Sequence, residues 1–160
     1  MDYFNPVAML VAAISAMVVG FLWYNPKIFG TAWMQAAGMT DDQVKGGNMV
    51  KIFGLSLVFA FLLATALPGI VTHQMGVFSL AQGKLGMLPS YEAFLVDYGN
   101  AFRTFKHGAF HGVLTGVFIA LPIIGTNALF ERKSAKYIFI NAGYWIVTLG
   151  VMGAILCGWH

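Results

Sequence analysis

Four long apolar stretches, each free of charged residues in its interior, organise this chain. They cover residues 6–24, 50–72, 108–130 and 137–159. A helix needs about 20 mainly apolar residues to cross the roughly 30 Å hydrocarbon core of a bilayer. Each stretch therefore predicts a transmembrane helix. The fold class we expect is an all-α integral membrane protein, with residues 1–160 as a single membrane domain of four spans.

The segments between these stretches predict two further kinds of helix. Asn25 and Pro26 suit the N-cap and first position of a short interfacial helix over 26–37, which Gly38 would end. We expect residues 74–89 to form a loop. Residues 90–106 carry apolar side chains at helical spacing and predict an amphipathic helix that continues without a break into the third span.

Small residues recur every four positions in the spans, as in closely packed membrane helices. The first span carries Ala8, Ala12, Ala16 and Gly20, the third carries Gly108, Gly112 and Gly116, and the fourth carries Ile146, Gly150, Ala154 and Gly158. We expect the third span to be the helix around which the others pack. Pro122 within it predicts a kink that frees the carbonyl of Phe118.

Composition supports lipid as the main solvent. Apolar residues make up 59% of the chain and charged residues 9%, whereas about a quarter of a soluble domain is charged. The net charge of +3 is not clustered as a nucleic-acid site would require, so the partners we expect are the lipid bilayer and, for the small-residue faces, further copies of the chain. The single cysteine, Cys157, lies in an apolar run and is expected to be a buried small residue.

Lysine and arginine counts give an orientation. The loops after the first and third spans carry six of these residues and the other side carries three. The positive-inside rule then places both termini outside the cytoplasm. Because no Lys or Arg precedes Lys27, the first span is expected to be a retained helix rather than a cleaved signal peptide.

Histidines are the best candidates for chemistry. His73 ends the second span, His107 and His111 begin the third, and His160 ends the chain, so the topology puts all four at one face. His107 and His111 are four residues apart and share a side of their helix. With His73 they could bind a transition metal, although no cofactor is required, or relay protons together with Thr115. They could equally be interfacial side chains that bond to loops and water.

A second polar group is expected at the opposite end of the bundle. Buried polar side chains in lipid need partners, which usually come from neighbouring helices. We expect these side chains to act mainly as structural links, with a polar binding pocket as the alternative. The expected members are Tyr24, Asn25, Asn127 and Asn141, and Ser56 and Tyr144 could meet them at the same end.

Two motifs resemble those of a known family. The first is the run from Trp23 to Trp33, Trp-Tyr-Asn-Pro-Lys-Ile-Phe-Gly-Thr-Ala-Trp, and the second extends from Pro122 through Asn127-Ala-Leu-Phe-Glu-Arg to Asn141-Ala-Gly-Tyr-Trp. Both are similar to the domain of unknown function 1761 family of small four-helix bacterial membrane proteins. The resemblance covers nearly the whole chain. It implies a location in the bacterial inner membrane and no particular activity.

Three functions stay open on this sequence. The first is a transport or channel-type protein for a small solute, ion or proton, which would use the histidines and the kinked third helix. The alternative is a non-catalytic scaffold or accessory subunit, and the second alternative is a small metal-dependent membrane enzyme. No span has Asp, Glu, Lys or Arg in its middle, where ion-coupled transporters usually place them.

Overall fold

The computed structural model describes residues 4–81 and 88–159, and within these ranges every regular element is a helix. Four helical segments are long and apolar enough to cross a membrane: Pro6–Trp23, Met49–Val71, Phe105–Phe130 and Ala135–Gly158. Their outer faces expose large apolar side chains, including Val50 and Phe130, each 87% exposed. The prediction of an all-α, four-span membrane protein is confirmed.

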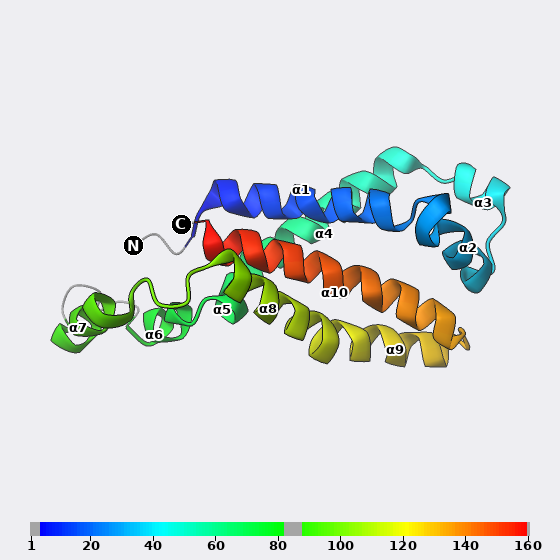
Figure 1. The fold of residues 1–160 in the computed structure, drawn as a ribbon. Coiled ribbons are helices and arrows are strands. Elements are labelled where there is room, and N and C mark those ends of the chain that lie inside the picture. Colours follow the sequence, from blue (N-terminus) through cyan, green and yellow to red (C-terminus); the bar gives the residue numbers. More distant parts are fainter. Residues whose placement is uncertain (1–3, 82–87, 160) are drawn as a thin grey trace.

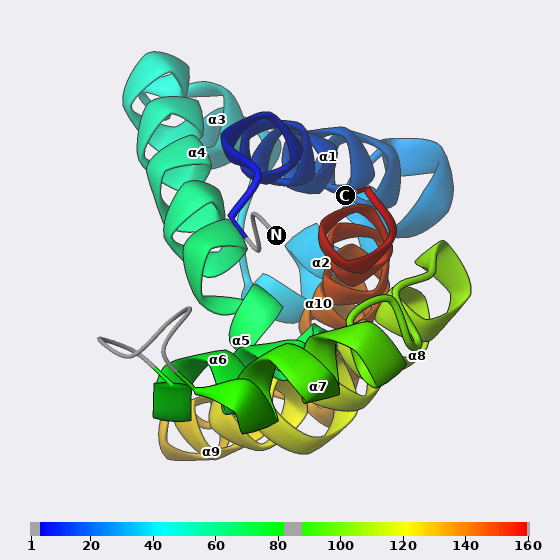
Figure 2. The ribbon, with the colours of Figure 1, turned by 90° about the vertical axis from the view of Figure 1, so that its left-hand side faces the viewer.

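The spans lie side by side and the connecting helices gather at the two ends (Figures 1 and 2). The spans are α1 (Pro6–Trp23), α4 (Met49–Ala66) extended by α5 (Pro68–Val71), α8 (Phe105–Thr115) continued through η2 (Gly116–Ala120) into α9 (Leu121–Phe130), and α10 (Ala135–Gly158). One end carries η1 (Pro26–Gly30), α2 (Thr31–Ala37) and α3 (Asp41–Lys45). The other carries α6 (Gln74–Ala81) and α7 (Pro89–Tyr98).

Short polar side chains start most of these helices. Asn5, Asn48, Thr104 and Ser134 each accept a hydrogen bond from a backbone N–H in the first turn of the span that follows. These bonds satisfy donors that a helix cannot satisfy internally. The interfacial helix forms as predicted, from the cap at Asn25 through η1 and α2 to the left-handed Gly38.

The fourth span, not the third, is the helix around which the others pack. α10 contacts α8, η2 and α9 along one side, α1 along another, and α2 and α5 near its two ends. α4, by contrast, packs chiefly on α1. The prediction for the third span was wrong because small residues show that a helix is closely packed, but not how many neighbours it has.

The predicted glycine face of the third span is confirmed as the contact between α8 and α10. Added Cβ atoms at Gly108 and Gly112 would overlap the backbone carbonyls of Gly153 and Leu149. The facing side of α10 includes three residues of its own predicted face, Ile146, Gly150 and Gly158, together with Leu149, Gly153 and Cys157. Backbone contact of this kind lets dispersion forces hold the helices together without a hydrophobic driving force.

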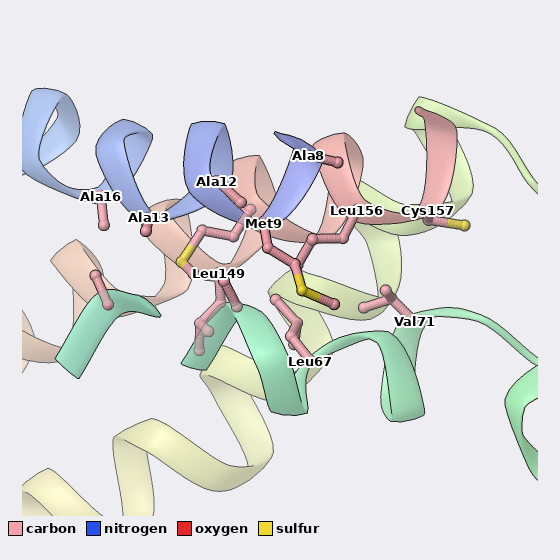
Figure 3. Close-up of a cluster of buried hydrophobic side chains, with 13 residues drawn as sticks. Ala8, Met9, Ala12, Ala13, Ala16, Leu67, Val71, Leu149, Leu156 and Cys157 are labelled. Carbon is pink, nitrogen blue, oxygen red and sulfur yellow. The ribbon is translucent and has the colours of Figure 1, made fainter. Parts of the chain in front are cut away.

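The alanine face of the first span forms the main apolar core with α4, α5 and α10. Ala8, Ala12 and Ala16 are each at most 1% exposed, as their spacing predicts. Leu149 and Leu156 of α10 and Leu67 and Val71 of the second span belong to the same cluster (Figure 3). Cys157 is a buried free thiol, as expected.

The third span accommodates Pro122 through a π-helical turn. η2 ends two residues before the proline, and the N–H of Leu121 donates to the carbonyl of Gly116, five residues back. Pro122 then falls in the first turn of α9, where a missing N–H costs least. The predicted kink is therefore a change of hydrogen-bond register that begins before the proline, a common site of helix distortion.

Two predictions for the segment before the third span were wrong. Residues 74–81 form α6 rather than a loop, and residues 82–87 lie outside the described ranges. The amphipathic helix ends at Tyr98 instead of continuing to 106, because the chain turns through Phe102, whose φ is +62°. Thr104 then caps α8 as a new helix.

Candidate functional site

Three histidines from two spans converge at one end of the bundle. The ring centroids of His107 and His111 are 4.4 Å apart, and that of His73 is 4.8 Å from His107 and 5.0 Å from His111. One ring nitrogen from each of the three lies within 4.8 Å of the other two. We call these residues the histidine cluster. The predicted fourth member, His160, lies outside the described residues.

Local structure explains how each ring reaches the cluster. α5 ends at Val71, and Thr72 is extended, so the chain brings His73 across the start of α8. Thr104 caps α8 through the N–H of His107, which sets the first turn that carries this ring. His111 follows one turn later on the same side of α8, as the spacing of four residues predicts.

The short loop before α8 adds an aromatic wall that the sequence does not predict. Phe102 is a bulky residue in the left-handed region, which is a strained conformation. Its ring lies 5.9 Å from that of His73 and 5.1 Å from that of His107. The Cys157 thiol donates to the Phe102 carbonyl at 3.5 Å and links this loop to α10.

Gln74 is a second contributor that sequence reasoning missed. Its side-chain amide nitrogen donates to the carbonyls of Tyr98 at 2.7 Å and Ala101 at 2.8 Å, and the residue is only 2% exposed. These bonds tie the segment after His73 to the end of α7. The sequence shows only that a glutamine directly follows a histidine, and this does not identify the carbonyl groups that the glutamine binds.

The closest contact in the cluster limits its protonation. Nε2 of His107 lies 2.9 Å from Nε2 of His73, a hydrogen-bond distance. A ring nitrogen must be deprotonated to accept, so these two atoms hold at most one proton between them. One of the two nitrogens carries this proton and the other accepts it, so a metal ion would have to displace the proton to bind both lone pairs.

Thr115 does not extend the cluster as predicted. It is buried one turn beyond His111, but its hydroxyl donates to the His111 carbonyl of its own helix at 2.8 Å. It lines a cavity of about 320 Å³ whose other walls are almost all apolar, such as Ile119, Leu149 and Trp145. Thr115 is thus next to the cluster in sequence without presenting a free polar group to it.

The opposite end of the bundle holds the predicted polar group in part. The Tyr24 hydroxyl donates to Oδ1 of Asn141 at 3.0 Å, and the Tyr144 hydroxyl donates to the Ala16 carbonyl at 3.1 Å. Burial, helped by the nearby Tyr144 and Tyr137 hydroxyls, raises the pKa of Tyr24, so it stays a neutral donor. These bonds join α1 to α10.

Asn25 and Asn127 do not join this network. Asn25 caps the following turn through the N–H of Lys27 at 2.9 Å. Asn127 is exposed on α9 and makes no side-chain hydrogen bond within the part of the chain that the structure describes. The helix that carries it packs on α10 through Ala128 instead, which is 2% exposed.

One comparison with known proteins gives a match. The model of a protein family described as "Protein of unknown function (DUF1761)" matches residues 7–157. Neither the curated proteins nor the solved structures include a match.

Proposed function

The chain belongs to the DUF1761 family of unknown function, and from that premise we propose that it is a multi-pass membrane protein that binds a cation at its histidine cluster. The observation that carries the proposal is the convergence of three ring nitrogens, all within 4.8 Å of one another, from the segment just after the second span and from the start of the third.

The donor set favours a transition metal of the zinc class. Imidazole nitrogen suits Zn²⁺ and its neighbours, whereas Ca²⁺ and Mg²⁺ prefer oxygen. Tetrahedral ligands about 2.0–2.1 Å from zinc lie about 3.3 Å apart. The pair of nitrogens at 2.9 Å and the outer limit of 4.8 Å bracket that value, so modest ring rotations would form the site.

Transport of the bound cation, or of protons, is a more specific proposal than binding alone. The π-helical turn before Pro122 supports it, because such turns often occur at functional sites. The Thr115 hydroxyl is bonded to the His111 carbonyl of its own helix, and the cavity beside it is lined by apolar side chains. Both observations argue against a polar path within a single copy of the chain. Several copies packed through their exposed apolar faces would have to supply one, in which case the protein would be a homo-oligomer.

A metal-dependent enzyme and an accessory subunit are the alternatives. Three histidines and an open fourth position are the arrangement of many catalytic zinc sites, which supports the enzyme. The hydrogen bonds of Tyr24 and Tyr144 hold helices together whatever the function, which suits a scaffold. From the lysine and arginine counts we propose that the cluster faces the outside of a bacterial inner membrane.

Equilibrium dialysis against Zn²⁺, followed by elemental analysis, tests the proposal. We expect about one zinc per chain, because three imidazoles form one site. His107→Ala combined with His111→Ala should remove this zinc, since one imidazole remains. Lys106→Gln, on the same turn and exposed, is the matched control and should retain it. Equal zinc content in the double variant and the unchanged protein would refute the proposal.

The same double variant separates transport from binding alone. Purified protein in proteoliposomes would be tested for zinc uptake and for dissipation of a pH gradient. If the cluster serves transport, flux should fall with the double variant and persist with Lys106→Gln. Zinc binding without flux above that of empty vesicles would leave the binding proposal standing and rule out transport.

A further inference from the structure

We propose a second site, at the end of the bundle opposite the histidine cluster, that binds one anionic glycerophospholipid from the surrounding bilayer. The site is a cavity of about 580 Å³ between α1, α4 and α10. This volume is within the range of about 300–1,000 Å³ that is usual for ligand pockets. The proposal is independent of the histidine cluster and of its metal.

The position of the cavity matches one leaflet. Its walls extend from Ala16 to Tyr24, the residue that caps α1, and from Ile52 to Ala60 on α4, a separation of eight positions along each helix. Eight residues of helix rise about 12 Å. Half of a hydrocarbon core of roughly 30 Å is about 15 Å, so the cavity extends from the interface to near the middle of the membrane.

The deep part of the cavity suits an acyl chain. Its walls there are apolar side chains from all three helices, among them Met17, Phe59 and Trp145. α4 packs closely against α1 but not against α10, which leaves this space between them. A hydrocarbon chain would restore the dispersion contacts that these walls lack.

The mouth of the cavity offers hydrogen-bond donors. Ser56 and Asn25 both line the cavity, and in the described ranges neither the Ser56 hydroxyl nor the Asn25 amide nitrogen donates to a partner. Asn25 uses only its oxygen, which accepts from the N–H of Lys27. Two free donors, one at the outer end of the lining and one about 6 Å deeper along α4, fit the ester carbonyl oxygens of a glycerolipid.

Positive charge at the mouth favours an anionic headgroup. Lys27 and Lys51 are exposed, and each directly adjoins a lining residue, Pro26 and Ile52. The lining itself contains no acidic side chain. Lysines at the membrane surface attract anionic lipids. The cavity therefore combines a chain-sized apolar space, carbonyl-binding donors and a phosphate-attracting rim.

Native mass spectrometry with phosphatidylglycerol and phosphatidylcholine tests this site. We expect the purified protein to retain one phosphatidylglycerol in preference to phosphatidylcholine. Lys27→Gln combined with Lys51→Gln should weaken that retention about tenfold or more, because it removes both cations. Lys136→Gln, at an exposed lysine of the same end whose sequence neighbours do not line the cavity, should leave it unchanged.

A second variant tests the cavity separately from the charge. Ser56→Phe should obstruct the cavity midway along its length and abolish lipid retention while both lysines remain, and circular dichroism would verify that it folds. The variant Lys27→Gln with Lys51→Gln changes only exposed side chains, so it gives a result even if Ser56→Phe does not fold. Equal retention by the lysine double variant and Lys136→Gln, or equal retention of the two lipids by the unchanged protein, would overturn the proposal.

Discussion

Replacing Gly112 by alanine is expected to lower the free energy of unfolding by about 3 kcal/mol, the upper end of the usual cost of overpacking. The added methyl would overlap the carbonyl group of Leu149 and approach Cα of Gly150 to 2.9 Å. These are backbone atoms, which cannot rotate away as a side chain can. α8 and α10 must therefore separate along their length. Denaturant titration of the purified protein in mixed micelles would measure the change.

Gly54→Ala is the matched control for this prediction. Gly54 is also a glycine within a span, but no atom outside its own helix backbone lies within 4 Å of an added Cβ. Helix propensity alone then favours alanine, by up to about 1 kcal/mol. Equal destabilisation by Gly112→Ala and Gly54→Ala would show that α8 and α10 are not in the close backbone contact described.

Zinc is expected to raise the free energy of unfolding by about 2.7 kcal/mol at a free concentration 100 times its dissociation constant. For a chain of this size that corresponds to roughly 5–10 °C in the melting temperature. The gain requires the folded cluster, because the unfolded chain does not hold His73 beside His107 and His111. Thermal melts with and without zinc would measure it, and His107→Ala with His111→Ala should abolish it.

The same stabilisation should depend on pH with a definite sign. Zinc binds neutral imidazole, and an unperturbed imidazole takes up its proton near about pH 6.5. The zinc-induced rise in melting temperature should thus be present at about pH 7.5 and be lost toward about pH 5. A rise that persists at about pH 5, or that survives the double histidine variant, would place the zinc on other ligands.

Much of the architecture follows from local patterns. Apolar runs of membrane length determine the four spans, and the small side chains of Gly108 and Gly112 determine a close contact. Helix starts are also local, because Asn48 or Ser134 needs only its own following turn as a partner. Such features are predictable because their physical cause lies within a few residues in the sequence.

Features that depend on several segments are less predictable. The topology places His73 at the same end as His107, but a ring separation of 4.8 Å depends on how α5 ends. The central position of α10 depends on all the spans together. Asn127 resembles Asn141 in sequence, yet one faces outward and the other bonds to Tyr24, because packing selects which side of each helix is buried.

Backbone conformation before the third span is the other unpredictable part. Helical spacing of apolar residues continues through Phe102, so the pattern alone predicts an unbroken helix. The left-handed turn at that residue is stabilised by distant partners, including the Cys157 thiol and the rings of His73 and His107. No local signal in the sequence corresponds to these contacts.

X-ray absorption at the zinc edge of the zinc-loaded protein tests the cation-binding role of the histidine cluster most directly. Three imidazole nitrogens at about 2.0–2.1 Å and one further light atom are the predicted first shell. In His107→Ala with His111→Ala this shell should disappear together with the bound zinc. An oxygen-only shell in the unchanged protein, or the same nitrogen shell in the double variant, would contradict the account.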